Sequence, residues 1–102
     1  MSQYSNQSDT SIIDRVDFKE PPMYQVLIHN DDYTSMEFVV AILMQVFDKT
    51  EIEAERVMLR VHQSGIGVAG FYTYEIAETK AEFVHQLAQQ NEFPLRCTLE
   101  RE

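Results

Sequence analysis

A strand-to-helix junction at residues 23–38 constrains the fold of this 102-residue chain more than any other feature. The apolar run at 23–28 is typical of a strand. Thr34 and Glu37 have the spacing of a capping box, in which both side chains bond to orphan amides at the start of a helix. Between strand and helix lie three acceptor-rich residues, Asn30, Asp31 and Asp32. Loops held by rigid elements often carry function, although these residues can also simply end the strand and shape a turn.

Two helices are predicted after this junction. The first covers residues 35–48, and the second opens with another capping box, Thr50 and Glu53, and stops at Gly65. Both carry apolar side chains at helical spacing. The first stripe is Val39, Ile42, Leu43, Val46 and Phe47, and the second is Ala54, Val57, Met58 and Val61, with His62 on its edge.

The rest of the chain predicts a strand, a third helix and a last strand. Residues 66–72 are extended, and Gly67 and Gly70 indicate bulges or a close approach of another element. Thr73 caps the helix, which closes at Asn91 and Pro94. Its stripe is Ala77, Lys80 or Ala81, Val84, and Leu87 or Ala88, and Leu95, Cys97 and Leu99 then alternate with polar residues as in a strand with one buried face.

The predicted order is therefore β-α-α-β-α-β. It favours an α+β two-layer sandwich, in which a three-stranded antiparallel sheet packs against three helices. Residues 1–20 are rich in Ser, Gln, Asn and Asp, so we expect a flexible, disordered extension there. Pro21-Pro22 marks the boundary with a single folded domain at 21–102.

Charge and composition exclude some classes of function. Seventeen acidic and eight basic side chains give a net charge of −9. This charge disfavours nucleic acid and anionic membranes as partners and favours a ligand with a cationic group. The N-terminus lacks the pattern of a signal peptide, there is one cysteine, and no apolar stretch could span a bilayer, so a cytoplasmic protein is expected.

An enzyme is not expected. No serine lies in a G-x-S-x-G elbow, and the three glycines form no phosphate loop. His29, Asp31, Asp32 and His62 could converge on a metal, but their spacing matches no metal-binding pattern, so no metal or cofactor is predicted. A binding module fits better, because the acceptors at 30–32 and His62 would lie beside apolar residues of both helices. His62 could also be a partly buried structural histidine.

Four sequence motifs in order resemble the ClpS family. They are Y-x-V-L-I-x-N-D-D-Y-T-x-M-E-F-V, A-E-R-V-M-L-x-V-H-x-x-G, A-G-x-x-T-x-E-I-A-E-T-K and P-L-x-C-T-L-E. The resemblance covers residues 21–102, the whole predicted domain. The resemblance implies an adaptor of the N-end rule pathway, not an enzyme. Such adaptors bind proteins that begin with Leu, Phe, Tyr or Trp and deliver them to the ClpAP protease.

The resemblance also implies a role for particular residues. The substrate's α-amino group would be held by Asn30, Asp31 or Asp32, and His62. The pocket for the first side chain would be formed by Thr34, Met36, Val39, Met58, Val61 and Leu95. The N-terminal domain of the ClpA unfoldase would meet Glu75 and Lys80, with Tyr72 and Thr73 close by. The unfoldase would engage the extension at 1–20 during hand-off. A monomer is expected.

The sequence departs from the family at two places. Ser35 stands where proline is common, and Gln63-Ser64 stand where an aromatic residue is often found. Neither change removes a residue of the implied pocket. The alternative is an interaction domain resembling the C-terminal domain of the ribosomal stalk protein, which would not need Asn30, Asp31 and His62 together.

Overall fold

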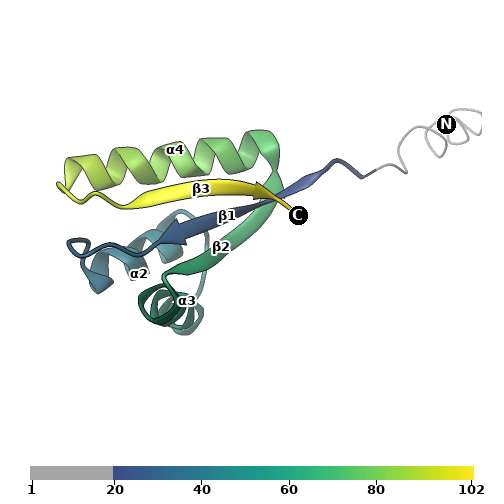
Figure 1. Cartoon of the computed structure of the whole chain (residues 1–102). Helices are drawn as coiled ribbons and strands as arrows, with labels where there is room; N and C mark the ends of the chain where they lie inside the picture. The colour runs from purple at the N-terminus through teal and green to yellow at the C-terminus, as the bar shows by residue number, and fades with distance from the viewer. Residues whose placement is uncertain (1–19) are drawn as a thin grey trace, which may run out of the picture.

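Six elements follow one another in the computed structural model, which describes residues 20–102. They are β1 (Met23–His29), α2 (Met36–Gln45), α3 (Glu51–Ser64), β2 (Ile66–Thr73), α4 (Tyr74–Gln90) and β3 (Arg96–Arg101) (Figure 1). This order confirms the predicted β-α-α-β-α-β arrangement. The extension predicted for residues 1–20 lies outside the described residues, except for Glu20.

The sheet has the order β2-β1-β3, with both pairs antiparallel. The first strand is therefore the central one, and its end at His29 pairs with the first residues of both neighbours, Ile66 and Arg96. The register shifts between Val26 and Leu27, opposite the segment that contains Gly70. This irregularity agrees with the bulge that the glycines of β2 predicted. The central position of β1 brings the loop after it close to the start of β2.

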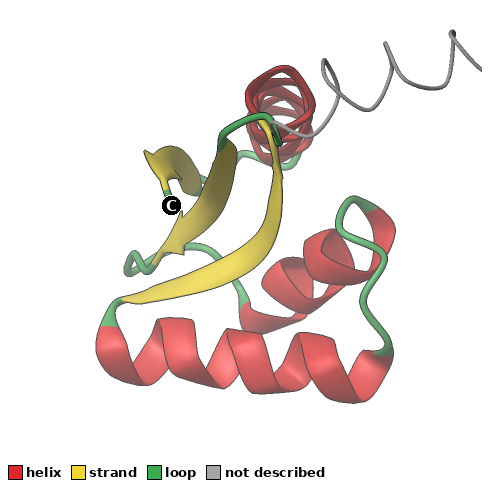
Figure 2. Ribbon diagram, turned by 90° about the vertical axis from the view of Figure 1, so that its right-hand side faces the viewer, coloured by secondary structure: helices red, strands yellow, loops and turns green. Residues whose placement is uncertain are grey.

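One face of the sheet packs against the helices. Alternate residues of β1, Val26 and Ile28, are fully buried, whereas Gln25 and Leu27 between them are only half-buried. Figure 2 shows α4 at one end of the curved sheet and α2 and α3 at the other. The helix stripes supply most of the remaining core, which comprises Val39, Ile42, Leu43, Val46, Phe47, Ala54, Val61, Ala69, Ala77, Ala81, Val84, Ala88, Leu95 and Cys97.

The residues predicted to begin and end the helices can be compared with the observed caps. Thr50 and Glu53 form the predicted capping box, with N···O distances of 3.0 and 3.2 Å, and Gly65 ends α3 in the left-handed region at φ 90°. Thr73 is the N-cap of α4, but its side chain makes no capping hydrogen bond. The first helix is shorter than the predicted 35–48, because it ends at Gln45 and Asp48 takes a left-handed φ of 57°. Val46 and Phe47 are nevertheless buried.

Candidate functional site

The loop after β1 is held against the end of α3. The backbone N–H of Asn30 donates to the carbonyl of Gly65 at 2.9 Å. Because Gly65 caps α3, this bond brings Asn30 next to the last turn of that helix, where His62 lies. Both side chains are exposed. Two polar groups that are 32 positions apart in the sequence thus face the same hollow.

Asp31 shapes the loop through its carboxylate. One oxygen, Oδ1, accepts the backbone N–H groups of Tyr33 and Thr34 at 2.8 and 2.7 Å, and Oδ2 accepts the Thr34 hydroxyl at 2.7 Å. Burial by itself raises the pKa of Asp31, but the hydrogen bonds from Thr34 and Tyr33 outweigh burial and leave this pKa below its usual value. Asp31 therefore stays ionised near neutral pH and adds negative charge to the loop.

This hydrogen bonding corrects the predicted cap of the first helix. Thr34 does not form a capping box with Glu37, and its hydroxyl instead donates to Oδ2 of Asp31. The N-cap is Ser35, whose Oγ accepts the N–H of Phe38 at 3.1 Å. The sequence did contain the signal, since serine is a strong N-cap, but the Thr34–Glu37 spacing obscured it. Ser35 makes Met36 the first residue of α2 and so places it beside the loop.

The other wall of the site comes from α3, which lies tightly against β2. A Cβ atom on Gly67 would lie 2.7 Å from Cγ2 of Val61 and 3.3 Å from the carbonyl oxygen of Val57. Only glycine lets the two backbones approach so closely, as its position in the strand predicted. Val61 is 3% exposed and Met58 is half-buried, whereas His62 on the next position faces solvent.

A cavity of about 240 Å³ is lined by the loop after β1 together with α2 and α3. Its polar lining is contributed by the loop and by the end of α3, and its apolar lining by the two helices. The lining residues are Asn30, Asp31, Asp32, Thr34, Met36, Val39, Met58, Val61 and His62. All nine were named from the sequence. The tenth residue named for the pocket, Leu95, does not line it and is instead a core side chain that is 4% exposed.

The cavity combines two chemical characters. Asn30, Asp32 and His62 offer exposed acceptors, and the Asp31 carboxylate supplies charge. Val39 and Val61, 6% and 3% exposed, form an apolar floor. Such a site can hold a group that is cationic at one end and apolar at the other.

A metal centre is not built here. Within residues 20–102, no three His, Cys, Asp or Glu side chains come together as a metal-binding group. His29, which the sequence analysis considered beside Asp31, instead bonds through Nε2 to the Thr98 hydroxyl at 2.7 Å. Burial, and then the charge of Arg96, lower the pKa of His29. The helices of the described chain also include none with the length and apolar character needed to cross a bilayer.

The residues named for the unfoldase lie away from this cavity, where β2 meets α4. Glu75 is exposed, and Tyr72 and Thr73 are half-buried. Lys80 is tied into the fold, because its Nζ donates to the carbonyl of Val46 at 2.7 Å and lies 5.1 Å from the centre of the Tyr72 ring.

Comparisons with known proteins agree with the fold and with the sequence motifs. Residues 19–98 match the family described as ATP-dependent Clp protease adaptor protein ClpS. A protein of that name from Desulfotalea psychrophila is 68% identical over the full length of both chains. Another from Nitratidesulfovibrio vulgaris is 54% identical over 90% of this chain and 92% of its own. The protein therefore belongs to the ClpS family of Clp protease adaptors, which confirms the resemblance drawn from the sequence.

A solved structure shows the same fold. ClpS2 of Agrobacterium tumefaciens, in a structure with bound L-phenylalaninamide, has a TM-score of 0.78 and 41% sequence identity to this chain. The likeness covers 81% of this chain and all of that one. The ligand of that protein has a free α-amino group and an aromatic side chain on one carbon.

Proposed function

We propose that this protein binds the free N-terminus of polypeptides that begin with Leu, Phe, Tyr or Trp and delivers them to the ClpAP protease. The observation that carries the proposal is the cavity itself, which joins the acceptors Asn30, Asp31, Asp32 and His62 to an apolar floor. A protein N-terminus is the one place in a chain where an ammonium and a side chain share a carbon. The phenylalaninamide bound by the related ClpS2 has the same two groups.

The size of the cavity and the energetics suit this ligand. The volume of about 240 Å³ exceeds the roughly 150 Å³ of an apolar cavity that admits benzene, so an aromatic ring has room. Each hydrogen bond to the ammonium contributes roughly 1.5–3 kcal/mol, and burial of Leu or Phe roughly the same. Association costs about 4 kcal/mol or more, so binding is expected near the micromolar range. Moderate affinity suits an adaptor that must release its cargo.

The same proposal covers the partner and the organisation of the chain. Residues 21–102 form the adaptor domain, and the extension at 1–20 is engaged by the unfoldase during hand-off. The surface of Tyr72, Thr73, Glu75 and Lys80 docks on the N-terminal domain of ClpA. The adaptor acts as a cytoplasmic monomer and catalyses nothing, since peptide-bond cleavage is left to the protease. The family to which the chain belongs supports this assignment.

Fluorescence anisotropy with matched peptides tests the binding step. A labelled peptide with N-terminal Leu should bind, and its acetylated form should not, because acetylation removes the charge and the donors of the amine. His62→Ala should weaken binding of the free peptide by about 10- to 150-fold, the value of one hydrogen bond to a charged group. Gln63→Ala is the control, because Gln63 is an exposed neighbour that does not line the cavity. Equal binding of free and acetylated peptides would refute amine recognition.

Delivery can be separated from binding. Removal of residues 1–17 should leave the peptide affinity intact and stop degradation of an N-terminal Leu substrate by ClpAP. If the truncated protein lost peptide binding, the extension would belong to the binding domain and not to the hand-off.

A further inference from the structure

A second hollow lies between α4 and β3 and shares no lining residue with the cavity. This groove has a volume of about 570 Å³. Its lining from α4 includes Glu78, Glu82 and His85, and its lining from β3 includes Cys97 and Leu99. Extended peptides bind to other proteins at exposed sheet edges of this kind, where they add a strand.

The backbone of β3 is open on the side that faces this groove. The strand order β2-β1-β3 leaves that edge of β3 without a neighbouring strand. Glu102 donates its backbone N–H to the carbonyl of Met23 at 3.0 Å and so faces β1. Backbone groups alternate in direction along an antiparallel strand, so Leu99 and Arg101 point theirs outward. The pairing of β3 with β1 contains no register shift, unlike that of β2, so this outer edge is regular and can template another strand.

His85 closes one end of the open edge. Its Nε2 accepts the backbone N–H of Cys97 at 3.0 Å, so this outward donor already has a partner. The backbone groups that remain open are those of residues 99–101. An added strand would therefore be short and would lie beyond Cys97, next to the half-buried side chain of Leu99.

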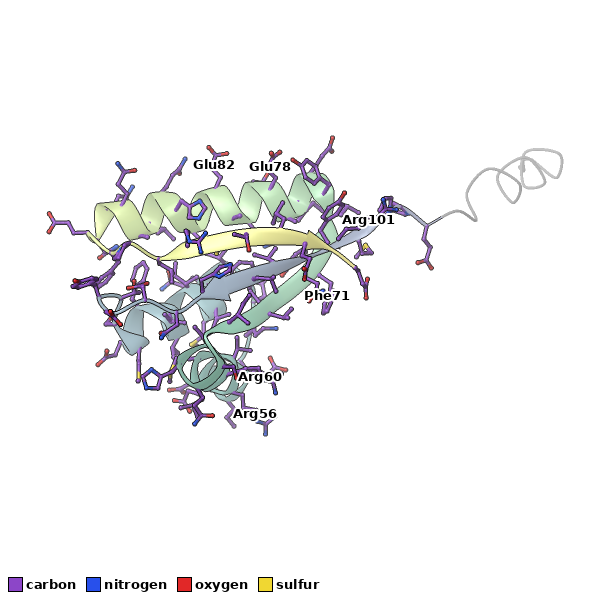
Figure 3. All side chains as sticks on the ribbon, in the orientation of Figure 1. Arg56, Arg60, Phe71, Glu78, Glu82 and Arg101 are labelled. Atoms are coloured by element: carbon purple, nitrogen blue, oxygen red, sulfur yellow. The ribbon has the colours of Figure 1, made fainter. Side chains whose placement is uncertain are left out.

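Two carboxylates of α4 accompany the open part of the edge. α4 and β3 run in opposite directions (Figure 1), so helix residues before His85 lie beside strand residues after Cys97. Glu82 and Glu78 lie about 4.5 and 10 Å back along α4 from His85, a length that a strand covers in about three residues. Both are exposed and project from α4 (Figure 3). The Tyr74 hydroxyl donates to Glu78 at 3.1 Å but does not neutralise its charge.

We propose that this groove binds an extended segment of a partner protein that carries lysine or arginine at alternate positions, and that the segment adds a fourth strand to the sheet beside residues 99–101. Alternate side chains of a strand point to the same face, so two basic residues of the segment would reach Glu78 and Glu82 together. No lysine or arginine of the described chain lines the groove and competes for these carboxylates. The site is separate from the cavity, so the adaptor would hold a second protein and an N-terminal ligand at the same time.

Charge argues against two other occupants. A second copy of the chain would bring its own Glu78 and Glu82 close to those of the first, and like charges repel. The chain's own N-terminal residues fit less well than a basic segment, because their acidic side chains outnumber the basic ones. These are Asp9, Asp14, Asp17 and Glu20 against Arg15 and Lys19.

Three labelled peptides of the form acetyl-Thr-X-Thr-X-Thr, with Lys, Gln or Glu at X, test the charge of the groove. Threonine favours extended backbone, and the acetyl group removes the amine that the cavity is proposed to bind. The peptides are titrated against the full chain by fluorescence anisotropy. We expect the Lys peptide to bind about 2- to 30-fold more tightly than the Gln peptide, the ratio that two exposed ion pairs provide. The Glu peptide should bind most weakly.

Matched variants show where the charge acts. In Glu78→Gln/Glu82→Gln the ratio of Lys to Gln peptide affinities should fall towards one. Glu51→Gln/Glu55→Gln removes the same charge from exposed positions of α3 that do not line the groove, and should keep the ratio. Thermal unfolding of each variant checks the fold, and Glu82→Gln alone replaces the groove variant if the latter does not fold.

Two measurements test the added strand itself. Amide hydrogen exchange at Leu99 and Arg101 should slow about tenfold when the Lys peptide is present at ten times its Kd. Arg101→Pro removes an outward N–H at an edge position, where proline is tolerated. Compared with Arg101→Gln, which removes the same charge, it should weaken binding of the Lys peptide by about fivefold, the value of one backbone hydrogen bond.

Several results would overturn the inference. Equal affinities of the Lys and Gln peptides, no binding of either, or an advantage that survives in Glu78→Gln/Glu82→Gln would remove the groove as a basic-segment site. Unchanged exchange at Leu99 and Arg101 in the saturated complex would mean that no strand is added. Displacement of the Lys peptide by a peptide with free N-terminal Leu would place it in the cavity. Tighter binding after removal of residues 1–17 would make the chain's own extension the occupant, and self-association that Arg101→Pro abolishes in sedimentation would make it a second copy.

Discussion

Met36→Ala should change which first residues the cavity accepts. Met36 lines the cavity, is 43% exposed and is the first residue of α2, beside the polar loop. A fully buried methionine side chain is worth roughly 1.5–3 kcal/mol, so a ligand that covers the exposed part gains about 1 kcal/mol. Peptides that begin with Leu or Phe should therefore bind to the variant about fivefold more weakly.

Peptides that begin with Ile or Val should behave in the opposite way. A β-branched residue carries two heavy atoms on its β-carbon, next to the backbone, and its χ1 is stiff. The second of these atoms would collide with Met36 at the mouth of the cavity. Leu and Phe carry only one heavy atom on the β-carbon and avoid this collision. Overpacking of this kind costs roughly 1–3 kcal/mol, and relief of it corresponds to about 5- to 150-fold. The variant should thus bring the affinities of Leu and Ile peptides much closer together.

The assay is anisotropy with Leu, Phe, Ile and Val peptides that carry alanine at positions two to four. Met44→Ala is the matched control, because Met44 lies on the same helix with similar exposure, 39%, but does not line the cavity. The reasoning is wrong if Met36→Ala lowers the melting temperature and leaves the order of the four affinities unchanged. Met36 would then simply be a packing residue.

Three further results are expected. Asp31→Asn should lower the free energy of unfolding at pH 7, and this difference should shrink as the pH falls, since the depressed pKa makes the carboxylate stabilise the fold fully above the unfolded pKa near 3.9 and progressively less as the pH falls through its folded pKa; a difference that stays constant below pH 3.9 in urea titrations would contradict this. Gly67→Ala should destabilise by about 1–3 kcal/mol, because its Cβ would lie 2.7 Å from Cγ2 of Val61, and an unchanged urea midpoint would argue against close packing there. Burial raises the pKa of Cys97 to about 12, so Ellman's reagent should label it only after unfolding, and rapid labelling of the native protein would place it at the surface.

Local signals in the sequence predicted most of the fold. Thr50, Glu53 and Gly65 set the ends of α3 as expected, because their capping bonds involve only residues within one turn. The end of α2 could not be predicted in this way. Val46 and Phe47 continue the apolar stripe of that helix and are buried, but Val46 is the C-cap and Phe47 lies beyond the end of the helix. Tertiary packing, rather than helical periodicity, buries these two side chains.

The candidate site was predictable to the extent that its residues lie at element ends. Asn30, Asp31 and His62 all flank such ends, and the bond from Asn30 to Gly65 brings those ends together. The role of Asp31 within the loop was missed, because many donors are available to a carboxylate and only the geometry shows that those of Tyr33 and Thr34 bind it. Leu95 was assigned to the pocket by resemblance alone, and its side chain turns into the core.

Lys80 is the residue for which resemblance and structure give different expectations. The resemblance assigns it to the unfoldase surface. In the fold, its Nζ donates to the Val46 carbonyl at 2.7 Å and lies within 5.9 Å of the centre of the Phe47 ring. Val46 is the C-cap of α2, and carbonyls at a helix end have no partner within the helix. Lys80 therefore supplies a hydrogen bond that α2 lacks, and its loss would act on stability as well as on docking.

Lys80→Met keeps the aliphatic stem and removes the donor, so it should lower the free energy of unfolding by about 1–2 kcal/mol, near the low end for a bond to a charged group because Lys80 is only half-buried. Glu75 is exposed, so Glu75→Ala should change the free energy of unfolding by less than about 0.5 kcal/mol. Both variants should weaken binding to the isolated ClpA N-terminal domain in calorimetry, since both side chains belong to the proposed docking surface. If Lys80→Met were as stable as the unmodified chain, the Val46 bond would not stabilise α2. If Glu75→Ala docked normally while Lys80→Met failed, the docking loss would follow from the altered fold and not from a shared surface.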